Sequence, residues 1–363
     1  PYYNLGILYS DMGDTATAIR YYQQAILIDT TYKSAYLNLA GLYTNQKKYD
    51  QAETIYRQCA NKASASAGYN GLGYMYFSMN DYPTAEYYYK EALNCNPDDE
   101  KVLANLGELY EDTRRFEESI ESYKKAIDIK PGYSYAYNGL GNTYFSMKRY
   151  RTALNYYNQA LQYDSLSKYT LYNIGNTYLN LDNRDSSFLF LDKALNIDPL
   201  YTVALYRKGD VYAKFLENDS AAFYFTKAIE ADPDEENAYN SFGNLKYAQK
   251  DYDAAISYYQ KSIKINPKFR EAWFNLGNCF DWLGDTLKAI DYYLKAIESD
   301  STYALAYSTV GGIYDELADY DNALKNYLNA VKYNPADIET LNDIGNMYYY
   351  KSDYDNAMIY YEK

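Results

Sequence analysis

A glycine returns along almost the whole chain at intervals of 34 residues or a multiple of 34. The one irregular step runs from Ala40, which occupies the place of a glycine, to Gly73, 33 residues later. An internal period of about 20–50 residues is typical of stacked repeat proteins rather than of one compact globule. The glycines in this register are Gly6, Gly73, Gly107, Gly141, Gly175, Gly209, Gly243, Gly277, Gly311 and Gly345.

Further positions repeat with the same period when each unit is numbered so that the glycine is position 8. Position 11 is Tyr or Phe in ten of eleven units, with Lys246 as the exception, and position 24 is aromatic in ten of eleven, with Leu191 as the exception. Position 4 is always large, position 20 is always Ala or Ser, and position 27 is always small. After an incomplete first unit, the units begin at residues 33, 66, 100, 134, 168, 202, 236, 270, 304 and 338.

These positions predict two helices in each unit. Positions 4, 7, 8 and 11 are three or four residues apart and form one helical stripe, and positions 20, 24 and 27 form a second stripe. Small residues at positions 8 and 20 allow the two helices to approach, and the aromatic ring at position 24 fills the remaining space. Proline at position 32, found at six of ten junctions, ends the second helix. Each unit is therefore an antiparallel helix pair whose exposed apolar face needs a neighbouring unit.

This pattern resembles the tetratricopeptide repeat family over essentially all 363 residues. The resemblance implies an all-α, right-handed solenoid superhelix of about eleven helix-turn-helix repeats, similar to the superhelical region of O-GlcNAc transferase-like proteins. Because the period is unbroken and no linker interrupts it, we expect residues 1–363 to form one continuous array. The first and last repeats are incomplete, so we expect the chain to be a fragment of a longer protein.

The net charge of −14 is unevenly distributed. Residues 1–181 carry 17 basic and 19 acidic side chains, whereas residues 182–363 carry 18 and 30. An acidic solenoid repels nucleic acid and anionic membranes and steers cationic partners toward its C-terminal half, although a solvated acidic surface that aids solubility explains the charge equally well. We expect no nucleic-acid binding and, because no apolar run of about 18 residues exists, no membrane insertion. A basic spot at Arg114, Arg115, Lys148, Arg149 and Arg151 is expected to be solvated surface.

The composition argues against an active site. The chain has no histidine, which removes the commonest general base and the usual zinc ligand sets. Its three cysteines follow no metal-binding or redox spacing, and no glycine-rich phosphate loop is present. Of the 53 tyrosines, 37 fall at positions 4, 11, 17, 23 and 24, where packing explains them. We therefore predict no catalytic residues, no metal site, no cofactor and no enzymatic activity.

The resemblance implies that the first helix of each pair lines a concave groove with positions 2, 5, 6, 9, 12 and 13. Asparagine recurs at positions 6 and 9, and its amide can pair with the backbone of an extended peptide, as in the asparagine ladder of the family member named above. The alternative is that asparagine is merely a tolerated polar residue there. The predicted peptide-binding residues are Asn105, Asn138, Asn142, Asn173, Asn176, Arg207, Asn244, Asn275 and Asn278.

A second comparison concerns the carboxylate clamp of chaperone-binding family members. Its five positions correspond here to Asn138, Asn142, Asn173, Val203 and Arg207, so that three match and both lysines are missing. The missing cations weaken the case for a clamp, and we instead expect one continuous polar patch in which Arg207 supplies the fixed cation. The alternative is that Arg207 pairs with a neighbouring acid such as Asp210.

The leading functional hypothesis is a non-enzymatic scaffold that binds a peptide or protein segment in the groove. The alternatives are the targeting or sensing arm of a larger enzyme or signalling protein, and a purely structural spacer. The sequence leaves the oligomeric state open. The lack of a disulfide framework slightly favours the cytoplasm and is also compatible with the periplasm.

Overall fold

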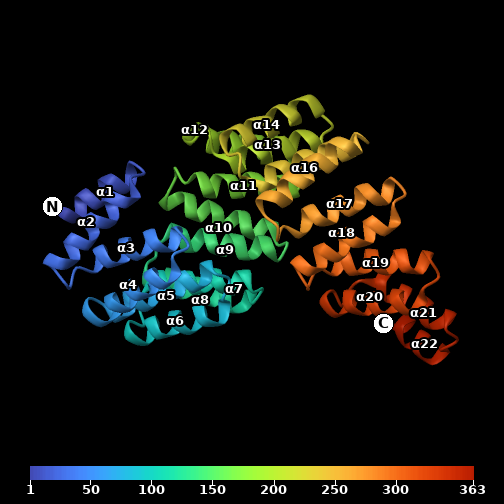
Figure 1. The fold of residues 1–363 in the computed structure, drawn as a ribbon, viewed down its shortest axis with the longest axis horizontal. Coiled ribbons are helices and arrows are strands. Elements are labelled where there is room, and N and C mark those ends of the chain that lie inside the picture. Colours follow the sequence, from blue (N-terminus) through green and yellow to red (C-terminus); the bar gives the residue numbers. More distant parts are fainter. The chain divides into compact units, whose positions relative to one another are not determined.

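A computed structural model describes all residues 1–363, and its regular structure consists of 22 α-helices and no strand (Figure 1). The chain comprises two compact units, Pro1–Asn183 and Arg184–Lys363. The prediction of an all-α solenoid of paired helices is confirmed, whereas the prediction that the whole chain forms one continuous array stays a prediction. No helix combines the length and the hydrophobicity that crossing a bilayer requires.

Each repeat contributes two helices of similar length, an odd-numbered first helix and an even-numbered second helix. The first unit contains α1 (Tyr2–Asp11), α2 (Thr15–Ile28), α3 (Lys33–Asn45), α4 (Tyr49–Lys62), α5 (Ala65–Ser78), α6 (Tyr82–Cys95), α7 (Glu100–Asp112), α8 (Phe116–Ile129), α9 (Ser134–Ser146), α10 (Tyr150–Tyr163) and α11 (Lys168–Asn180). The second contains α12 (Arg184–Ile197), α13 (Thr202–Lys214), α14 (Asn218–Ala231), α15 (Glu236–Ala248), α16 (Tyr252–Ile265), α17 (Arg270–Trp282), α18 (Thr286–Ser299), α19 (Ala304–Glu316), α20 (Tyr320–Tyr333), α21 (Ile338–Tyr350) and α22 (Tyr354–Glu362).

The turn inside each repeat has one geometry along the chain. Position 15 adopts a positive φ in all eleven repeats, although only Gly13 and Gly284 are glycines there. The next residue directly precedes the second helix, and in six repeats it is an aspartate whose carboxylate accepts a hydrogen bond from a backbone N–H of the first turn, which satisfies one unpaired helix donor. These caps are Asp14, Asp81, Asp251, Asp285, Asp319 and Asp353.

The repeating glycine exists because an aromatic ring lies against it. A Cβ built on Gly277 would lie 2.6 Å from Cε1 of Tyr293, and one on Gly243 would lie 2.5 Å from Cε1 of Tyr259. Both rings are 1% exposed. The ring at position 24 also reaches the next repeat, since a Cβ on Gly139 would lie 2.2 Å from Cζ of Tyr123. The glycine at position 8 is therefore a close-contact site between helices, as the period predicts.

A second aromatic contact also recurs within the repeats. The ring at position 11 of the first helix stacks on the ring at position 23 of the second helix, with centroid distances of 5.3 Å for Tyr9–Tyr21 and 5.5 Å for Tyr76–Tyr88. The same pair recurs as Tyr144–Tyr156, Tyr212–Tyr224, Phe280–Tyr292 and Tyr348–Tyr360. Stacked aromatic pairs add to the area that the rings bury. Much of the high tyrosine content is therefore explained by packing.

The first helices form the more closely packed side of each stack. Contacts between first helices of successive repeats join α3 with α5, α5 with α7, α7 with α9 and α9 with α11 in the first unit. In the second unit they join α13 with α15 and α15 with α17. Second helices instead pack between the first helix of their own repeat and that of the next, as α8 does between α7 and α9 and α16 does between α15 and α17. Side chains on the first helices of adjacent repeats therefore come within reach of one another.

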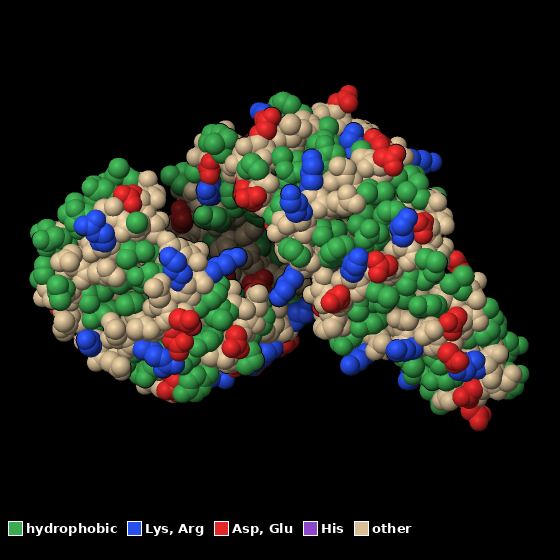
Figure 2. Space-filling view, in the orientation of Figure 1, with side chains coloured by type: hydrophobic (Ala, Val, Ile, Leu, Met, Phe, Trp, Pro, Cys, Tyr) green, Lys and Arg blue, Asp and Glu red, His purple; other side chains and the backbone are tan.

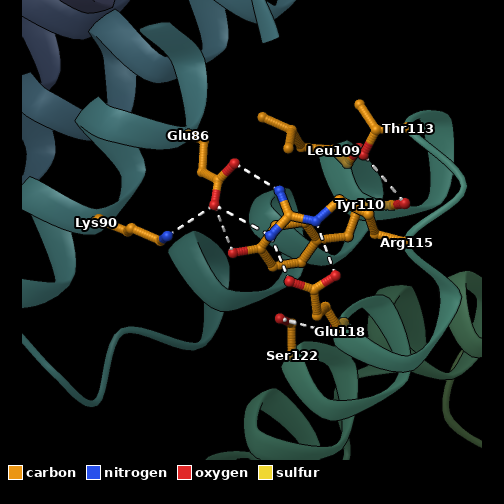
Figure 3. Close-up of polar contacts among 8 residues, drawn as sticks. All are labelled: Glu86, Lys90, Leu109, Tyr110, Thr113, Arg115, Glu118 and Ser122. Atoms are coloured by element: carbon orange, nitrogen blue, oxygen red, sulfur yellow. Dashed lines mark hydrogen bonds and ion pairs between the residues drawn. The ribbon is translucent and has the colours of Figure 1, made fainter. Parts of the chain in front are cut away.

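Arg115 is not simply solvated, in contrast to the expectation for the basic spot. Its guanidinium lies 2.6 Å from Oε2 of Glu86 in the preceding repeat, pairs with Glu118, and lies 4.2 Å from the ring centroid of Tyr110 (Figure 3). Hydrogen bonds from Arg115, Lys90 and Tyr110 outweigh burial and lower the pKa of Glu86 to about 2. This arginine therefore joins α6 to the turn between α7 and α8.

Candidate functional site

The candidate site is the surface formed by positions 2, 5, 6, 9, 12 and 13 of the first helices, which we call the first-helix face. All nine predicted peptide-binding residues occupy these positions. Asn105, Asn138, Asn142, Asn173 and Asn176 lie in the first unit, and Arg207, Asn244, Asn275 and Asn278 lie in the second. The single continuous patch expected from Asn138 to Arg207 therefore stays a prediction, whereas the geometry inside each unit can be described.

Asparagines of adjacent repeats are hydrogen-bonded to one another on this face. In the first unit, Nδ2 of Asn173 donates to Oδ1 of Asn138 at 3.2 Å and to Oδ1 of Asn142 at 2.9 Å. The second unit repeats the arrangement with Asn275, which donates to Asn240 at 3.0 Å and to Asn244 at 3.1 Å. The asparagine at position 6 of one repeat thus bridges positions 5 and 9 of the preceding repeat.

The core tyrosine at position 24 orients the same amides. The hydroxyl of Tyr157 donates to Oδ1 of Asn142 at 2.9 Å, and that of Tyr259 donates to Oδ1 of Asn244 at 2.8 Å. Asn278 accepts in the same way from Tyr293 at 2.7 Å. Each of these rings is almost fully buried, so its hydroxyl is a fixed donor. The asparagine oxygen at position 9 is therefore held by its own repeat.

This pairing determines what the amides can offer to a ligand. The oxygen of Asn142 accepts two hydrogen bonds, whereas no group of the chain accepts from its nitrogen. An asparagine amide carries two N–H donors, and the side chain of Asn142 is half-buried at the edge of a cleft. The first-helix face therefore presents N–H donors, which complement the carbonyl or carboxylate oxygens of a ligand.

Two other predicted asparagines of the first unit differ from this arrangement. Asn105 donates to Oδ1 of Asn70 in the preceding repeat at 3.0 Å, so only half of the bridge is present there. Asn176 contributes a backbone carbonyl, which accepts from Nδ2 of Asn180 at 2.9 Å, while its own side chain is half-buried. Asn176 therefore lies on the face without taking part in the network.

A cleft of 180 Å³ lies on the first-helix face between α7 and α9. It is lined by Glu108, Glu111, Asp112, Tyr123, Tyr135, Asn138, Gly139 and Asn142. The hydroxyl of Tyr135 donates to Oε2 of Glu108 at 2.7 Å, and that of Ser146 donates to Oε1 of Glu111 at 3.2 Å. No basic side chain lines the cleft, and its acidic residues are not arranged to hold a metal ion.

Burial without a cation changes the protonation of these acids. Desolvation raises the pKa of Glu111 to about 8, despite the hydrogen bond from Ser146, and the charges of Asp112 and Glu108 add to the increase. Burial also raises the pKa of Asp112. Near neutral pH the cleft therefore combines a protonated Glu111 with the amide nitrogens of Asn138 and Asn142.

Arg207 forms an ion pair on the same face of the second unit. Its Nη1 lies 2.9 Å from Oδ2 of Asp210, one turn later in α13. The guanidinium also lies 5.3 Å from the ring centroid of Tyr206. Burial raises the pKa of Asp210, and the charge of Arg207 opposes that increase. The charge of Arg207 is thus shared with Asp210, which was the stated alternative to a ligand contact.

Sequence reasoning missed the partners of the predicted asparagines and the acids of the cleft. Asn138 and Asn240, at position 5, receive the same kind of bond, but only Asn138 was singled out. The spacing of the asparagines could have identified these pairs, because the bonded residues are separated by one residue more or three residues fewer than the 34-residue period. Asn173 lies 35 residues after Asn138 and 31 residues after Asn142.

Two curated proteins resemble parts of the chain. Anaphase-promoting complex subunit CDC16 of Saccharomyces cerevisiae is 27% identical over 116 residues, which is 30% of this chain and 13% of that protein. Anaphase-promoting complex subunit 7 of Arabidopsis thaliana is 27% identical over 97 residues, which is 27% of this chain and 17% of that protein. The chain therefore spans only a small part of the length of these relatives.

Solved structures resemble the chain over nearly its whole length. A human IFIT1 dimer with m7Gppp-AAAA has a TM-score of 0.63 at 18% identity, and yeast Tom70 has a TM-score of 0.62 at 16% identity. Both similarities cover 99% of this chain and 88% of the other. At these identities the likeness shows the fold alone.

Sequence models described as tetratricopeptide repeat match along almost the whole chain. The matched segments are residues 10–72, 66–99, 98–165, 169–199, 206–268, 240–304, 304–337 and 338–363. Residues 66–99 and 304–337 each match over one 34-residue period, and residues 304–337 contain the helix pair α19 and α20. The chain belongs to the tetratricopeptide repeat family.

Proposed function

We propose that the chain is a non-enzymatic scaffold whose first-helix face holds an extended peptide or a segment of another protein. One observation carries the proposal. Hydrogen bonds within the chain occupy the oxygens of Asn142 and Asn244, and the amide nitrogens of these residues have no partner in the chain. The side chain of Asn142 is half-buried and that of Asn244 is exposed, so their N–H groups are accessible to an acceptor on a ligand.

An extended peptide fits this arrangement better than a small molecule. Its backbone offers one carbonyl acceptor per residue in any sequence, and asparagine occupies position 9 of the first helices α9, α11, α15, α17 and α21. The cleft of 180 Å³ between α7 and α9 is smaller than the usual ligand pocket of about 300–1,000 Å³, but it is large enough for a side chain. A peptide that lies across several repeats would thus gain many weak contacts.

The comparisons support a protein as the partner. The curated relatives are subunits of the anaphase-promoting complex. We extend only the coarse property of binding other proteins to this chain.

RNA is less well supported as a ligand, although the IFIT1 structures contain capped or triphosphorylated oligonucleotides. RNA binding relies on cations that neutralise phosphates. Only Lys101, Arg207 and Lys214 occupy positions of the first-helix face, and Arg207 is paired with an acid. We expect no binding of PPP-AAAA in a titration at physiological salt, and submicromolar binding would contradict that expectation.

The second candidate is a targeting or sensing arm of a larger enzyme or signalling protein. This candidate is considered because the chain matches only 13% and 17% of the lengths of the two curated relatives, which are larger proteins. Sequencing the complete gene separates it from the first candidate. A catalytic module elsewhere in the same polypeptide supports the arm, and its absence supports an independent scaffold.

Peptide display followed by cross-linking tests the leading proposal. A random peptide library is selected on the immobilised chain, and the selected peptides are synthesised with a photoreactive group. We expect cross-links to first helices, for example to α9 and α11, and few to the second helices α8 and α10. Cross-links confined to second helices, or a library that yields no binder, would refute the proposal.

A further inference from the structure

In the last three repeats the first-helix face is acidic and carries no basic residue. Positions 2, 5, 6, 9, 12 and 13 of α17, α19 and α21 comprise 18 residues. Six of these residues are acidic, and none is Lys or Arg. This surface, which we call the acidic face, lies entirely within the second unit. Its acids are Glu271, Asp281, Asp315, Glu316, Glu339 and Asp343.

Five of these six acids have no counter-ion. Glu271 pairs with Arg270 at 2.9 Å, whereas Asp281, Asp315, Glu316, Glu339 and Asp343 form no ion pair. Some acids on nearby second helices and turns are paired, such as Asp291 with Lys295 at 2.9 Å and Asp285 with Lys288 at 2.6 Å. On the face of the molecule seen in Figure 2, basic and acidic side chains are likewise interspersed.

The uncompensated charges lie close enough to repel one another. Burial raises the pKa of Asp343, and the charges of Asp315, Asp337 and Glu339 raise it further. Asp315 is also half-buried, and burial raises its pKa as well. Charges gathered in this way cost stability unless a cation joins them.

The acidic face also has exposed apolar groups. Trp282 is 68% exposed beside Asp281, and its ring stacks on Tyr252 at 6.5 Å between centroids. Leu305 is 53% exposed on the next first helix. Long basic side chains match such a surface because their methylene stems cover apolar groups while the charged ends reach acids or an aromatic ring.

We propose that the acidic face of α17, α19 and α21 docks an extended peptide segment rich in lysine or arginine. The inference rests on the proposed function, because it names the chemistry of the segment that the first-helix face would hold. Charge complementarity carries the assignment, since five acids lack a counter-ion and Trp282 offers a ring to a cation. A second copy of the chain is the other occupant to consider, and the test below separates it.

The probes are three synthetic decapeptides with blocked ends, in which serine alternates with lysine, with glutamate or with glutamine. Trp282 reports binding directly once Trp273 is replaced by Phe, because the chain contains only two tryptophans. We expect the lysine peptide to shift the fluorescence of Trp282 and to bind more weakly as salt is added. The glutamate peptide should leave the fluorescence unchanged.

Two double variants separate local charge from net charge. Asp315→Asn with Asp343→Asn removes two charges from the acidic face, whereas Asp253→Asn with Glu298→Gln removes two exposed charges from the second helices α16 and α18. We expect the first pair to weaken binding of the lysine peptide roughly tenfold and the control pair to weaken it less than about twofold. The first pair should stay folded, because it relieves repulsion.

Three results would overturn the inference. Equal losses in the two double variants would mean that net charge alone attracts the peptide. Binding of the glutamine peptide as tightly as the lysine peptide would leave the proposed function intact and remove the preference for basic segments. Dimerisation that buries Trp282, detected by sedimentation, would assign the face to a second copy. If display also yields no binder to any first helix, the proposed function itself fails.

Discussion

Two neighbouring glycines in α19 should respond in opposite ways to the same substitution. An ideal Cβ on Gly311 would lie 2.7 Å from Cδ1 and 2.8 Å from Cε1 of Tyr327, whereas one on Gly312 would meet only the hydroxyl oxygen of that ring at 3.7 Å. Tyr327 is 3% exposed and packs with Ile344 and Met347 of the next repeat, so its ring cannot easily retreat. Gly311→Ala and Gly312→Ala are therefore matched in sequence and differ in available space.

The magnitudes follow from two effects. Replacing a helical glycine by alanine stabilises a helix by about 1 kcal/mol, and this gain is common to both variants. Forcing a methyl group into a packed core typically costs about 1–3 kcal/mol, and only Gly311→Ala incurs that cost. We expect Gly312→Ala to raise the free energy of unfolding by up to about 1 kcal/mol. We expect Gly311→Ala to be less stable than Gly312→Ala by about 1–3 kcal/mol.

Urea unfolding followed by circular dichroism gives the free energies, and native-state hydrogen exchange shows whether the change is confined to α19, α20 and their neighbours. Local effects are expected because each repeat contacts only adjacent repeats. Equal stability of the two variants, or a more stable Gly311→Ala, would refute the view that the ring of Tyr327 requires a glycine.

Three further predictions concern stability. Glu111→Gln should flatten the pH dependence of the free energy of unfolding between about pH 5 and 8. Because the pKa of Glu111 is raised to about 8, the folded protein keeps a proton that the unfolded chain releases, and the wild type loses at most about 1.4 kcal/mol of stability per pH unit as pH rises. The exposed control Glu117→Gln should leave that slope in place. Leu216→Gly should stabilise the chain by about 0.5–1 kcal/mol in urea unfolding. Leu216 has a φ of 63°, which glycine adopts with less strain, and its side chain is 83% exposed, so little packing is lost. A destabilised variant would count against backbone strain at that turn. Tyr259→Ala should cost about 3–5 kcal/mol and increase hydrogen exchange mainly in α15, α16 and α17, and loss of all helicity in one step at low denaturant would contradict a nearest-neighbour array.

The fold could be predicted because its constraints repeat. Gly277 against Tyr293 is one of many copies of the same contact, so the period and the helical stripes give the helix pair without a structure. The turn between the helices could not be predicted in the same way. Its left-handed residue is Arg114, Lys148 or Leu216 as readily as glycine, since the hydrogen bonds of two flanking helices impose the conformation.

Contacts between repeats were harder to predict than contacts within them. Lys208 occupies the apolar stripe at position 7, yet it is 8% exposed, because its ammonium lies 2.5 Å from Oδ1 of Asp192 and over the ring of Tyr224. The repeating asparagines are visible in the sequence, but the orientation of the Asn142 amide is set by the hydrogen bond that its oxygen accepts from Tyr157. Sequence alone indicates the polar residues and leaves open which hydrogen bonds they have already made.

The affinity of a selected peptide for Asn142→Asp tests the central claim most directly. This substitution keeps the oxygen that accepts from Tyr157 and Asn173 and removes both N–H donors of a side chain that lines the cleft. Asn158→Asp on α10 is the control, because it makes the same chemical change at an exposed position of a second helix. We predict that Asn142→Asp weakens binding about fivefold or more, from the lost hydrogen bond and repulsion of peptide carbonyls, while Asn158→Asp binds like the wild type. Equal affinities for the two variants would contradict the claim that the amide nitrogens of the first-helix face hold the ligand.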